Sequence, residues 1–299
     1  MRADPTYINS LTQALNNTAN TTNSLSSELS SGLRVTSLSD DPIVAAESIR
    51  LGSTMSGIDT FVANAATQSS MLQVTDSTLG DVVTQLTSAS TLAIEAANGT
   101  MNSSDLKALT QQVIGIRDQI LGLANTSYQG RYLFAGSQGT TQPYSVDDTT
   151  VPATAVYAGD TVTQSIETPG GQMIQMNLPG SSIFGSGSTG TLATLNQLIA
   201  DLQSGADTDT LSADSAALNN ALSNVSTQRS VLDASLSTLK ATSTYAQTQN
   251  ANLQAIQSTL VSADPAAIAT QLKTNETQYE ALLGVISSMN STNLFDYLK

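Results

Sequence analysis

Adjacent carboxylates are the residues of this chain whose types and spacing could do chemistry. Asp40 and Asp41 could act in acid/base catalysis or hold a cation, but Asp41 precedes a proline, so we expect a helix cap beside a solvated carboxylate. Asp147 and Asp148 lie in a Thr-rich segment, where a calcium site would need more oxygen ligands at ordered spacing. We therefore predict no catalytic residue and no metal site.

The 299-residue chain contains no Cys, no His and no Trp. It therefore lacks thiol nucleophiles, the commonest general base and the usual zinc ligands. Residues 136–139 (GSQG) have neither the Lys of a phosphate loop nor the βαβ context of a dinucleotide loop, so we interpret them as a turn. These features predict a protein that is not an enzyme and has no cofactor.

The charge balance is acidic, with 24 Asp and Glu against 10 Lys and Arg, a net charge of −14. The basic residues are scattered, which argues against nucleic acid or an anionic membrane as a partner. No apolar run approaches the roughly 20 residues of a membrane span. The N-terminus has no basic segment followed by an apolar stretch, so we expect no cleaved signal peptide.

Two heptad stripes, one near each end of the chain, are the strongest pattern among the elements. Both advance in steps of three and four, which keeps one helix face toward a partner as in a coiled coil. Neither has a core beside it in sequence, so we expect each to pair with the other or with neighbouring subunits. The apolar positions are Ile8, Leu11, Leu15, Leu25 and Leu29 in the first stripe, and Ile268, Leu272, Tyr279, Leu282, Ile286 and Met289 in the second. Thr18, Thr22 and Asn275 are polar members of the stripes.

Helix start and stop residues divide the chain into five regions. Gly32 should end the first helix, the Asp-Pro pairs at 41–42 and 264–265 should start helices, and Asn98-Gly99 should end a long one. The predicted regions are an N-terminal assembly helix and loop (1–40), a long helical hairpin (41–130), a β-rich insert (131–190), long helices (191–262) and a C-terminal assembly helix (263–299).

The insert loses the helical period. Residues 162–166 and 173–178 alternate like strands around the turn at 169–171, and the Gly- and Ser-rich stretch 180–190 reads as a linker. Residues 131–134 (RYLF) could be a recognition patch or an anchor of the insert on the helices. The predicted fold is mainly α: an elongated helical rod, with N- and C-terminal coiled-coil helices and a small β-rich insert domain.

Several short motifs resemble those of the bacterial flagellin superfamily. Residues 29–34 (LSSGLR) followed by 40–42 (DDP) resemble its N-terminal signature, and residues 96–100 (AANGT) are similar to its first long hairpin. Pro42 and the segment 130–136 (GRYLFAG) resemble the hook-associated junction proteins more than filament flagellins. The residues that carry this resemblance are Leu29, Gly32, Arg34, Asp40, Asp41, Pro42, Gly130, Arg131 and Tyr132, with Leu294, Phe295, Tyr297 and Leu298 near the C-terminus.

The resemblance implies a flagellin-like fold and a structural subunit that joins hook and filament by coiled-coil polymerisation of its terminal helices. It also implies secretion to the extracellular flagellum without a cleaved signal peptide. The implied partners are other copies of the chain, a hook-side junction protein, flagellin and an export chaperone at the C-terminal helix. In such an assembly the resemblance implies that the insert faces outward. Three alternatives stay open: a filament flagellin subunit, a secreted binding module that recognises a ligand with its β insert, and an enzyme, which would require the acidic loop residues to bind a metal.

Overall fold

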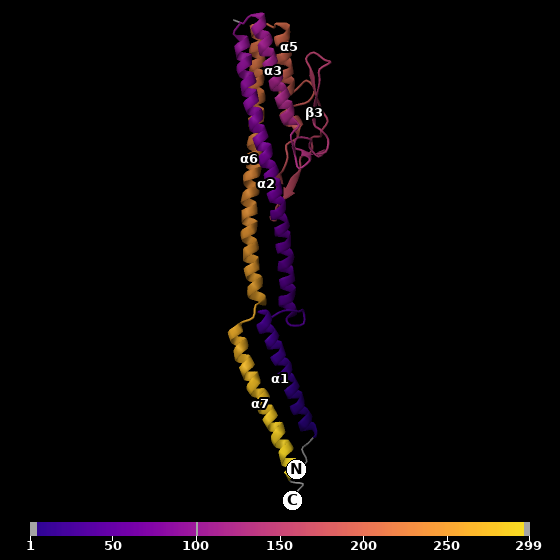
Figure 1. The fold of residues 1–299 in the computed structure, drawn as a ribbon, viewed down its shortest axis with the longest axis vertical. Coiled ribbons are helices and arrows are strands. Elements are labelled where there is room, and N and C mark those ends of the chain that lie inside the picture. The colour runs from indigo at the N-terminus through magenta and orange to yellow at the C-terminus, as the bar shows by residue number, and fades with distance from the viewer. Residues whose placement is uncertain (1–4, 100, 296–299) are drawn as a thin grey trace. The chain divides into compact units, whose positions relative to one another are not determined.

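The computed structural model describes the backbone of residues 5–99 and 101–295 and is mainly helical (Figure 1). The helices are α1 (Pro5–Ser31), α2 (Pro42–Ala97), α3 (Ser103–Ala124), α4 (Gly180–Ile183), α5 (Thr191–Ser204), α6 (Thr208–Val261) and α7 (Pro265–Phe295). The strands are β1 (Ser127–Tyr128), β2 (Arg131–Tyr132), β3 (Tyr144–Asp147), β4 (Thr154–Tyr157), β5 (Ser165–Glu167) and β6 (Met173–Gln175). Among the helices described, none combines the length and apolar character that crossing a membrane requires.

The chain divides into two compact units, and the boundaries fall inside the long helices α2 and α6. The terminal unit consists of Met1–Ser56 and Gln249–Lys299, and the central unit of Gly57–Thr248. Helix ends in the terminal unit follow the predicted residues: Gly32 after α1 has a φ of +71°, which favours glycine. Asp41 accepts a hydrogen bond from Val44 N at 3.2 Å, and Asp264 accepts one from Ala266 N at 2.9 Å.

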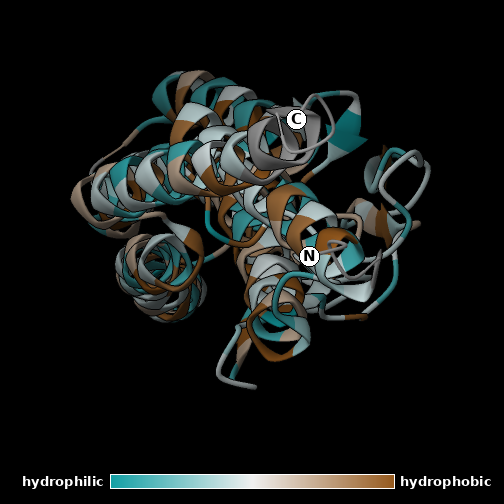
Figure 2. Ribbon diagram, turned by 90° about the horizontal axis from the view of Figure 1, so that it is seen from below, coloured by the Kyte–Doolittle hydropathy of each residue, from teal (hydrophilic) through white to brown (hydrophobic). Residues whose placement is uncertain are grey.

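The core of the central unit is a bundle of helices. Apolar residues recur at helical spacing along one face of α2, and this face is buried through Ile58, Phe61, Ala65, Leu72, Leu79, Val82, Leu86 and Ala93. α2 and α6 run antiparallel, because Asp76 pairs with Arg229 at 2.6 Å while Ser90 donates to Asn219 at 3.1 Å. Figure 2 shows apolar and polar residues alternating along the helices, as such amphipathic packing requires.

The β-rich insert contains three two-stranded antiparallel hairpins: β1–β2, β3–β4 and β5–β6. The predicted hairpin around residues 169–171 is confirmed as β5–β6, although each strand is only three residues long. Ile174, Met176 and Leu178 are all buried, as their alternation predicts. The other two hairpins were not predicted, and each is short enough that alternation within it carries little information.

The prediction of a linker at residues 180–190 is wrong. This stretch contains α4 and packs into the insert, where Ile183 and Phe184 are fully buried. The Phe184 ring meets Phe134 edge-on, with centroids 5.1 Å apart, and Tyr144 donates from its hydroxyl to Gly185 O at 2.8 Å. Gly is needed here for close backbone approach, a use that composition does not distinguish from flexibility.

Residues 131–134 anchor the insert. Leu133 and Phe134 are buried, so the interpretation of this segment as a recognition patch is wrong for these two side chains. Phe134 O accepts hydrogen bonds from Gly180 N at 2.8 Å and from the Tyr157 hydroxyl at 2.9 Å. The backbone and the ring of Phe134 therefore hold separate parts of the insert together.

A buried carboxyl group links α5 and α6 in the central unit. Asp214 is 7% exposed, its Oδ2 has no hydrogen-bond partner among the described residues, and its side chain faces Asp201. Burial, followed by the charge of Asp201 and a hydrogen bond with it, raises the pKa of Asp214 to about 6. The folded state therefore favours the protonated carboxyl group.

We predict that Asp214→Asn stabilises the protein near neutral pH. Because the pKa of Asp214 is raised in the folded state, its contribution to the stability of the folded protein is most favourable below pH 4 and is lost as the pH rises toward 6. A shift of about two pKa units corresponds to a loss of no more than about 3 kcal/mol in the free energy of unfolding at neutral pH. Urea unfolding between pH 4 and 7 should show a falling free energy of unfolding for the wild type and a flatter curve for Asp214→Asn. Parallel curves would contradict the prediction.

Candidate assembly surface and the joint between its helices

α1 and α7 pack against each other in the terminal unit and run antiparallel (Figure 1). Side chains are described for residues 6–99 and 101–288. The α7 side chains that are not exposed all belong to the predicted stripe: Ile268, Leu272, Asn275, Leu282 and Ile286. On α1, the stripe positions Leu11, Leu15, Thr18 and Thr22 are half-buried and Leu25 is buried. The two predicted stripes are therefore the faces on which these helices lose solvent exposure.

Part of each stripe remains outside this contact. Ile8 is 45% exposed, Leu29 is 44% exposed and Tyr279 is 36% exposed. The side chains of Met289, Leu294 and Phe295, and the whole of Tyr297 and Leu298, lie outside the described residues. One copy of the chain thus leaves these three apolar stripe positions exposed to solvent.

The terminal unit has few buried apolar side chains and many exposed ones. Of the 40 buried apolar residues in the described chain, only Leu25, Val35, Leu51 and Ile268 belong to it. Of the 18 exposed large apolar residues, 11 belong to it: Tyr7, Ile8, Leu29, Leu33, Leu38, Ile43, Ile49, Ile256, Tyr279, Leu283 and Val285. Exposed apolar surface of this kind marks interaction sites.

Eight of these exposed residues lie outside the predicted stripes, and Leu38, Ile43 and Ile49 are the most exposed of them. Leu38 is 60% exposed, Ile43 is 82% exposed and Ile49 is 68% exposed. They lie in the loop after α1 and in the first turns of α2, outside any heptad stripe. The only hint in the sequence is their position: Leu38 lies between the motif residues at 29–34 and 40–42, and Ile43 and Ile49 lie shortly after them.

Two main-chain hydrogen bonds connect residues 32–34, after α1, with residues 261–263, before α7, and we call this connection the joint. Arg34 N donates to Val261 O at 2.8 Å, and Ala263 N donates to Gly32 O at 2.9 Å. The loop between α1 and α2 is thereby hydrogen-bonded to the loop between α6 and α7. The motif residues Gly32 and Arg34 therefore have a structural role in this joint.

The Arg34 side chain reinforces the joint. Its guanidinium group donates to Leu260 O at 3.2 Å and lies 3.5 Å from the Asp41 carboxylate. Because the Arg34 side chain is 48% exposed, the ion pair contributes little stability. The contact to the Leu260 carbonyl oxygen is directional and satisfies a group at the C-terminal end of α6.

Asp40 is more than a solvated neighbour of the helix cap, which corrects our expectation. Its carboxylate accepts hydrogen bonds from Thr36 N at 2.9 Å, Ser37 N at 2.8 Å and both hydroxyl groups. The two backbone hydrogen bonds first, and then the hydroxyl groups, lower the pKa of Asp40 to about 2. Asp40 therefore organises the loop, while Asp41 caps α2.

We predict that this loop keeps its structure to low pH. The pKa of Asp40 is lowered in the folded state, so its contribution is complete above about pH 4 and is lost as the pH falls toward 2. A carboxyl-carbon NMR titration should give Asp40 an apparent pKa near 2, and Asp40→Asn should shift the Thr36 and Ser37 amide signals at neutral pH. An apparent pKa near the ordinary value of 3.8 would contradict the hydrogen-bonding pattern.

The motif residues 130–132 lie in the central unit. Gly130 has a φ of +76° in the turn between β1 and β2. Tyr132 N donates to Gly139 O at 2.8 Å, and a side chain at Gly139 would come within 2.8 Å of Arg131 Nε. These residues therefore fix the first hairpin.

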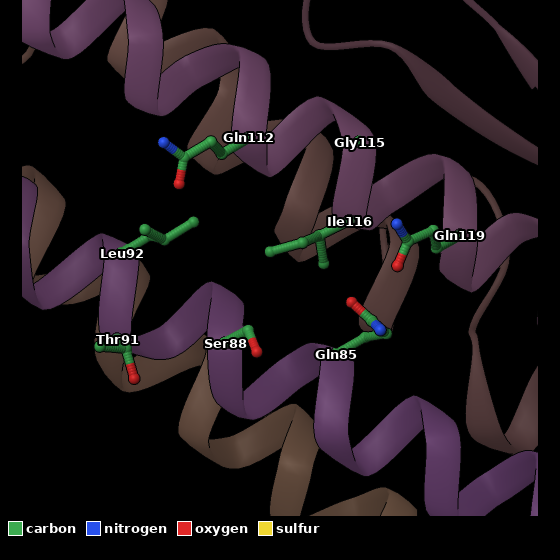
Figure 3. A pocket seen from close by; sticks show the side chains of 8 residues that line it. All are labelled: Gln85, Ser88, Thr91, Leu92, Gln112, Gly115, Ile116 and Gln119. Carbon is green, nitrogen blue, oxygen red and sulfur yellow. The ribbon is translucent and has the colours of Figure 1, made fainter.

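A groove between α2 and α3 has a volume of about 610 Å³ (Figure 3). Figure 3 shows the residues that line it: Gln85, Ser88, Thr91 and Leu92 on one helix, and Gln112, Gly115, Ile116 and Gln119 on the other. Gly115 has no side chain and therefore leaves the groove wider at this position. Its lining side chains carry no ionisable group, so the groove offers no general acid or base. Elsewhere in the described chain, no cluster of three His, Cys, Asp or Glu residues has the arrangement of a metal site.

Two segments of the chain match the models of a known family. Residues 6–139 match the bacterial flagellin N-terminal helical region, and residues 216–298 match the bacterial flagellin C-terminal helical region. A relative from Escherichia coli, called flagellar hook-associated protein 3, is 26% identical over 295 residues, which cover 91% of each chain. Polar flagellin F of Vibrio parahaemolyticus is 34% identical, but over only 37% of this chain and 30% of its own.

The fold has a solved counterpart in the structure of a putative flagellar hook-associated protein from Vibrio parahaemolyticus. The TM-score is 0.66 at 20% sequence identity, and the match covers 74% of this chain and 99% of the other. At this identity the likeness establishes the fold alone. The two matched regions together include most of the sequence, so the chain belongs to the bacterial flagellin family.

Proposed function

We infer that this chain is a structural subunit of the bacterial flagellum at the junction between hook and filament, and that it has no enzymatic role. The observation that carries this inference is the terminal unit, which exposes 11 large apolar residues and buries only four apolar ones among the side chains described. Such a unit gains most of its stability by packing against other subunits. The nearly full-length match to a hook-associated protein, against a partial match to a flagellin, favours the junction over the filament.

The proposed mechanism is polymerisation through α1 and α7. Neighbouring copies bring further helices against the stripes, so that exposed positions such as Ile8, Leu29 and Tyr279 become buried. Each large apolar side chain that leaves water contributes about 1.5–3 kcal/mol, which offsets the entropy of ordering the helices. We expect the seam to consist of the predicted stripe residues, including Met289.

Polar residues in the seam would define its register. Thr18, Thr22 and Asn275 are half-buried between apolar neighbours, and polar groups in a coiled-coil seam select one register at some cost in stability. Only 11% of the residues are charged, so these contacts should depend little on salt concentration.

The proposed partners are other copies of this chain, a hook-side junction protein, flagellin, and an export chaperone that covers α7 before assembly. α7 suits a chaperone because its non-stripe face also exposes Leu283 (44%) and Val285 (40%). We propose export to the extracellular flagellum without a cleaved signal peptide. The predicted region boundaries at 40, 130, 190 and 262 remain part of this proposal.

Loss of the gene tests the junction role. Cells without this protein should build hooks that carry no filament and should release flagellin into the medium, and a plasmid copy should restore filaments. Normal filaments in the deletion strain would refute the role. Long filaments formed by the purified protein alone would instead identify it as a filament flagellin.

A further inference from the structure

A second cavity, of about 240 Å³, lies in the central unit between α3, α5 and the loop that joins β3 to β4. Its walls include Ile114 and Arg117 from α3, Asn196 and Ile199 from α5, and Asp148 and Pro152 from the loop. It therefore combines apolar side chains with a few polar groups, which is the usual composition of a small-molecule site.

Asn196 is a buried polar side chain with a hydrogen-bond donor that the described residues do not use. The residue is 2% exposed, and its Oδ1 accepts a hydrogen bond from Arg117 Nη1 at 3.5 Å. This contact orients the amide, because the guanidinium group is only a donor. Nδ2 of Asn196 has no hydrogen-bond partner among the described residues, and buried amide donors are nearly always paired.

The charges around the cavity favour a neutral ligand. Arg117, whose side chain is 11% exposed, lies 2.9 Å from the Asp118 carboxylate and 3.1 Å from that of Asp148. One guanidinium group against two carboxylates leaves a local charge of about −1, which disfavours anions. A cation would need several free oxygen ligands, but both carboxylates are engaged by Arg117.

We propose that this cavity binds a small, neutral, polyhydroxylated molecule of monosaccharide size. A ligand hydroxyl can accept from Asn196 Nδ2 and donate to Asp148, whose Oδ1 alone contacts Arg117. The carbon face of a sugar ring matches Ile114, Ile199 and Pro152. The volume lies below the roughly 300–1,000 Å³ of drug-sized pockets, which excludes larger ligands.

An NMR titration of the ¹⁵N-labelled full-length chain tests the proposal. The probes are glucose, galactose, mannose and N-acetylglucosamine, with inorganic phosphate and glycerol as comparison compounds. At least one sugar should shift the side-chain amide signals of Asn196 in a saturable manner, while phosphate should leave them unchanged. No saturable shift with any sugar, or an equal response to phosphate, would overturn the proposal, and an equal response to glycerol would identify an adventitious additive only.

Two variants locate the site, and their sugar binding is followed by the backbone amide signals of the residues that line the cavity. Asn196→Leu removes the unpaired donor and should weaken sugar binding by about tenfold or more, the equivalent of one hydrogen bond. Gln197→Leu, at the exposed neighbouring position of α5, should bind like the wild type. Circular dichroism establishes that each variant is folded. If Asn196→Leu proves unstable, Ile199→Phe fills the cavity instead, and unchanged binding in either folded cavity variant would overturn the proposal.

Discussion

Leu282→Asp abolishes assembly and leaves the helices of the central unit folded. Leu282 is half-buried on the α7 stripe, where a neighbouring subunit would complete its burial. The substitution removes about 1.5–3 kcal/mol of apolar burial at each contact and adds a carboxylate that must be desolvated. We expect the concentration required for polymerisation to rise by about 100-fold or more. Sedimentation of the purified protein measures this concentration.

Thr277→Asp is the matched control for this substitution. Thr277 lies on the same helix, is exposed and does not belong to the stripe, so the same charge placed there should leave assembly nearly unchanged. Far-ultraviolet circular dichroism of both variants should show the same central helices as the wild type. Normal polymerisation of Leu282→Asp, or equal loss in Thr277→Asp, would show that the seam lies elsewhere.

Gly185→Ala strongly destabilises the central unit. A Cβ at Gly185 would lie 1.9 Å from Thr189 O and 2.5 Å from Gly190 Cα, and the backbone φ is +81°. These atoms are backbone, so relief requires moving the segment that packs Phe184 into the insert. We expect a loss of more than about 3 kcal/mol, the range of severe packing defects. Urea unfolding followed by the near-ultraviolet signal of the tyrosines measures it.

Gly187→Ala separates backbone conformation from crowding. Gly187 has a φ of +64°, but a Cβ there meets no atom within 4 Å. This variant carries only the conformational cost of a left-handed residue, about 1–2 kcal/mol. Similar losses for the two variants would mean that the close backbone approach at Gly185 does not limit stability.

Helix positions were predictable because long amphipathic periods repeat their information many times. The buried face of α2 extends from Ile58 to Ala93, and each step of three or four residues supports the same orientation. The ends of α1 and α2 and the starts of α2 and α7 were predictable because Gly32, Gly99, Asp41 and Asp264 have specific capping functions. α3 starts at Ser103, where the side chain of Asn102 caps it.

The insert and the joint were less predictable because their stability comes from contacts between distant residues. Tyr144 and Gly185 are 41 positions apart, and the hydrogen bond between them has no local periodicity. The function of Asp40 depends on a loop conformation that brings Thr36 and Ser37 onto one carboxylate. Exposure of Ile43 and Ile49 could not be read from an amphipathic pattern, because neither belongs to a heptad stripe and their exposure depends on which elements pack beside the start of α2.

The joint between Gly32–Arg34 and the Val261–Ala263 segment has a mechanical consequence. Its two principal hydrogen bonds join main-chain atoms on both sides. A force applied to α1 is therefore transmitted to the C-terminal end of α6 through main-chain atoms alone. Tension on α1 is thereby shared with α6 at the joint.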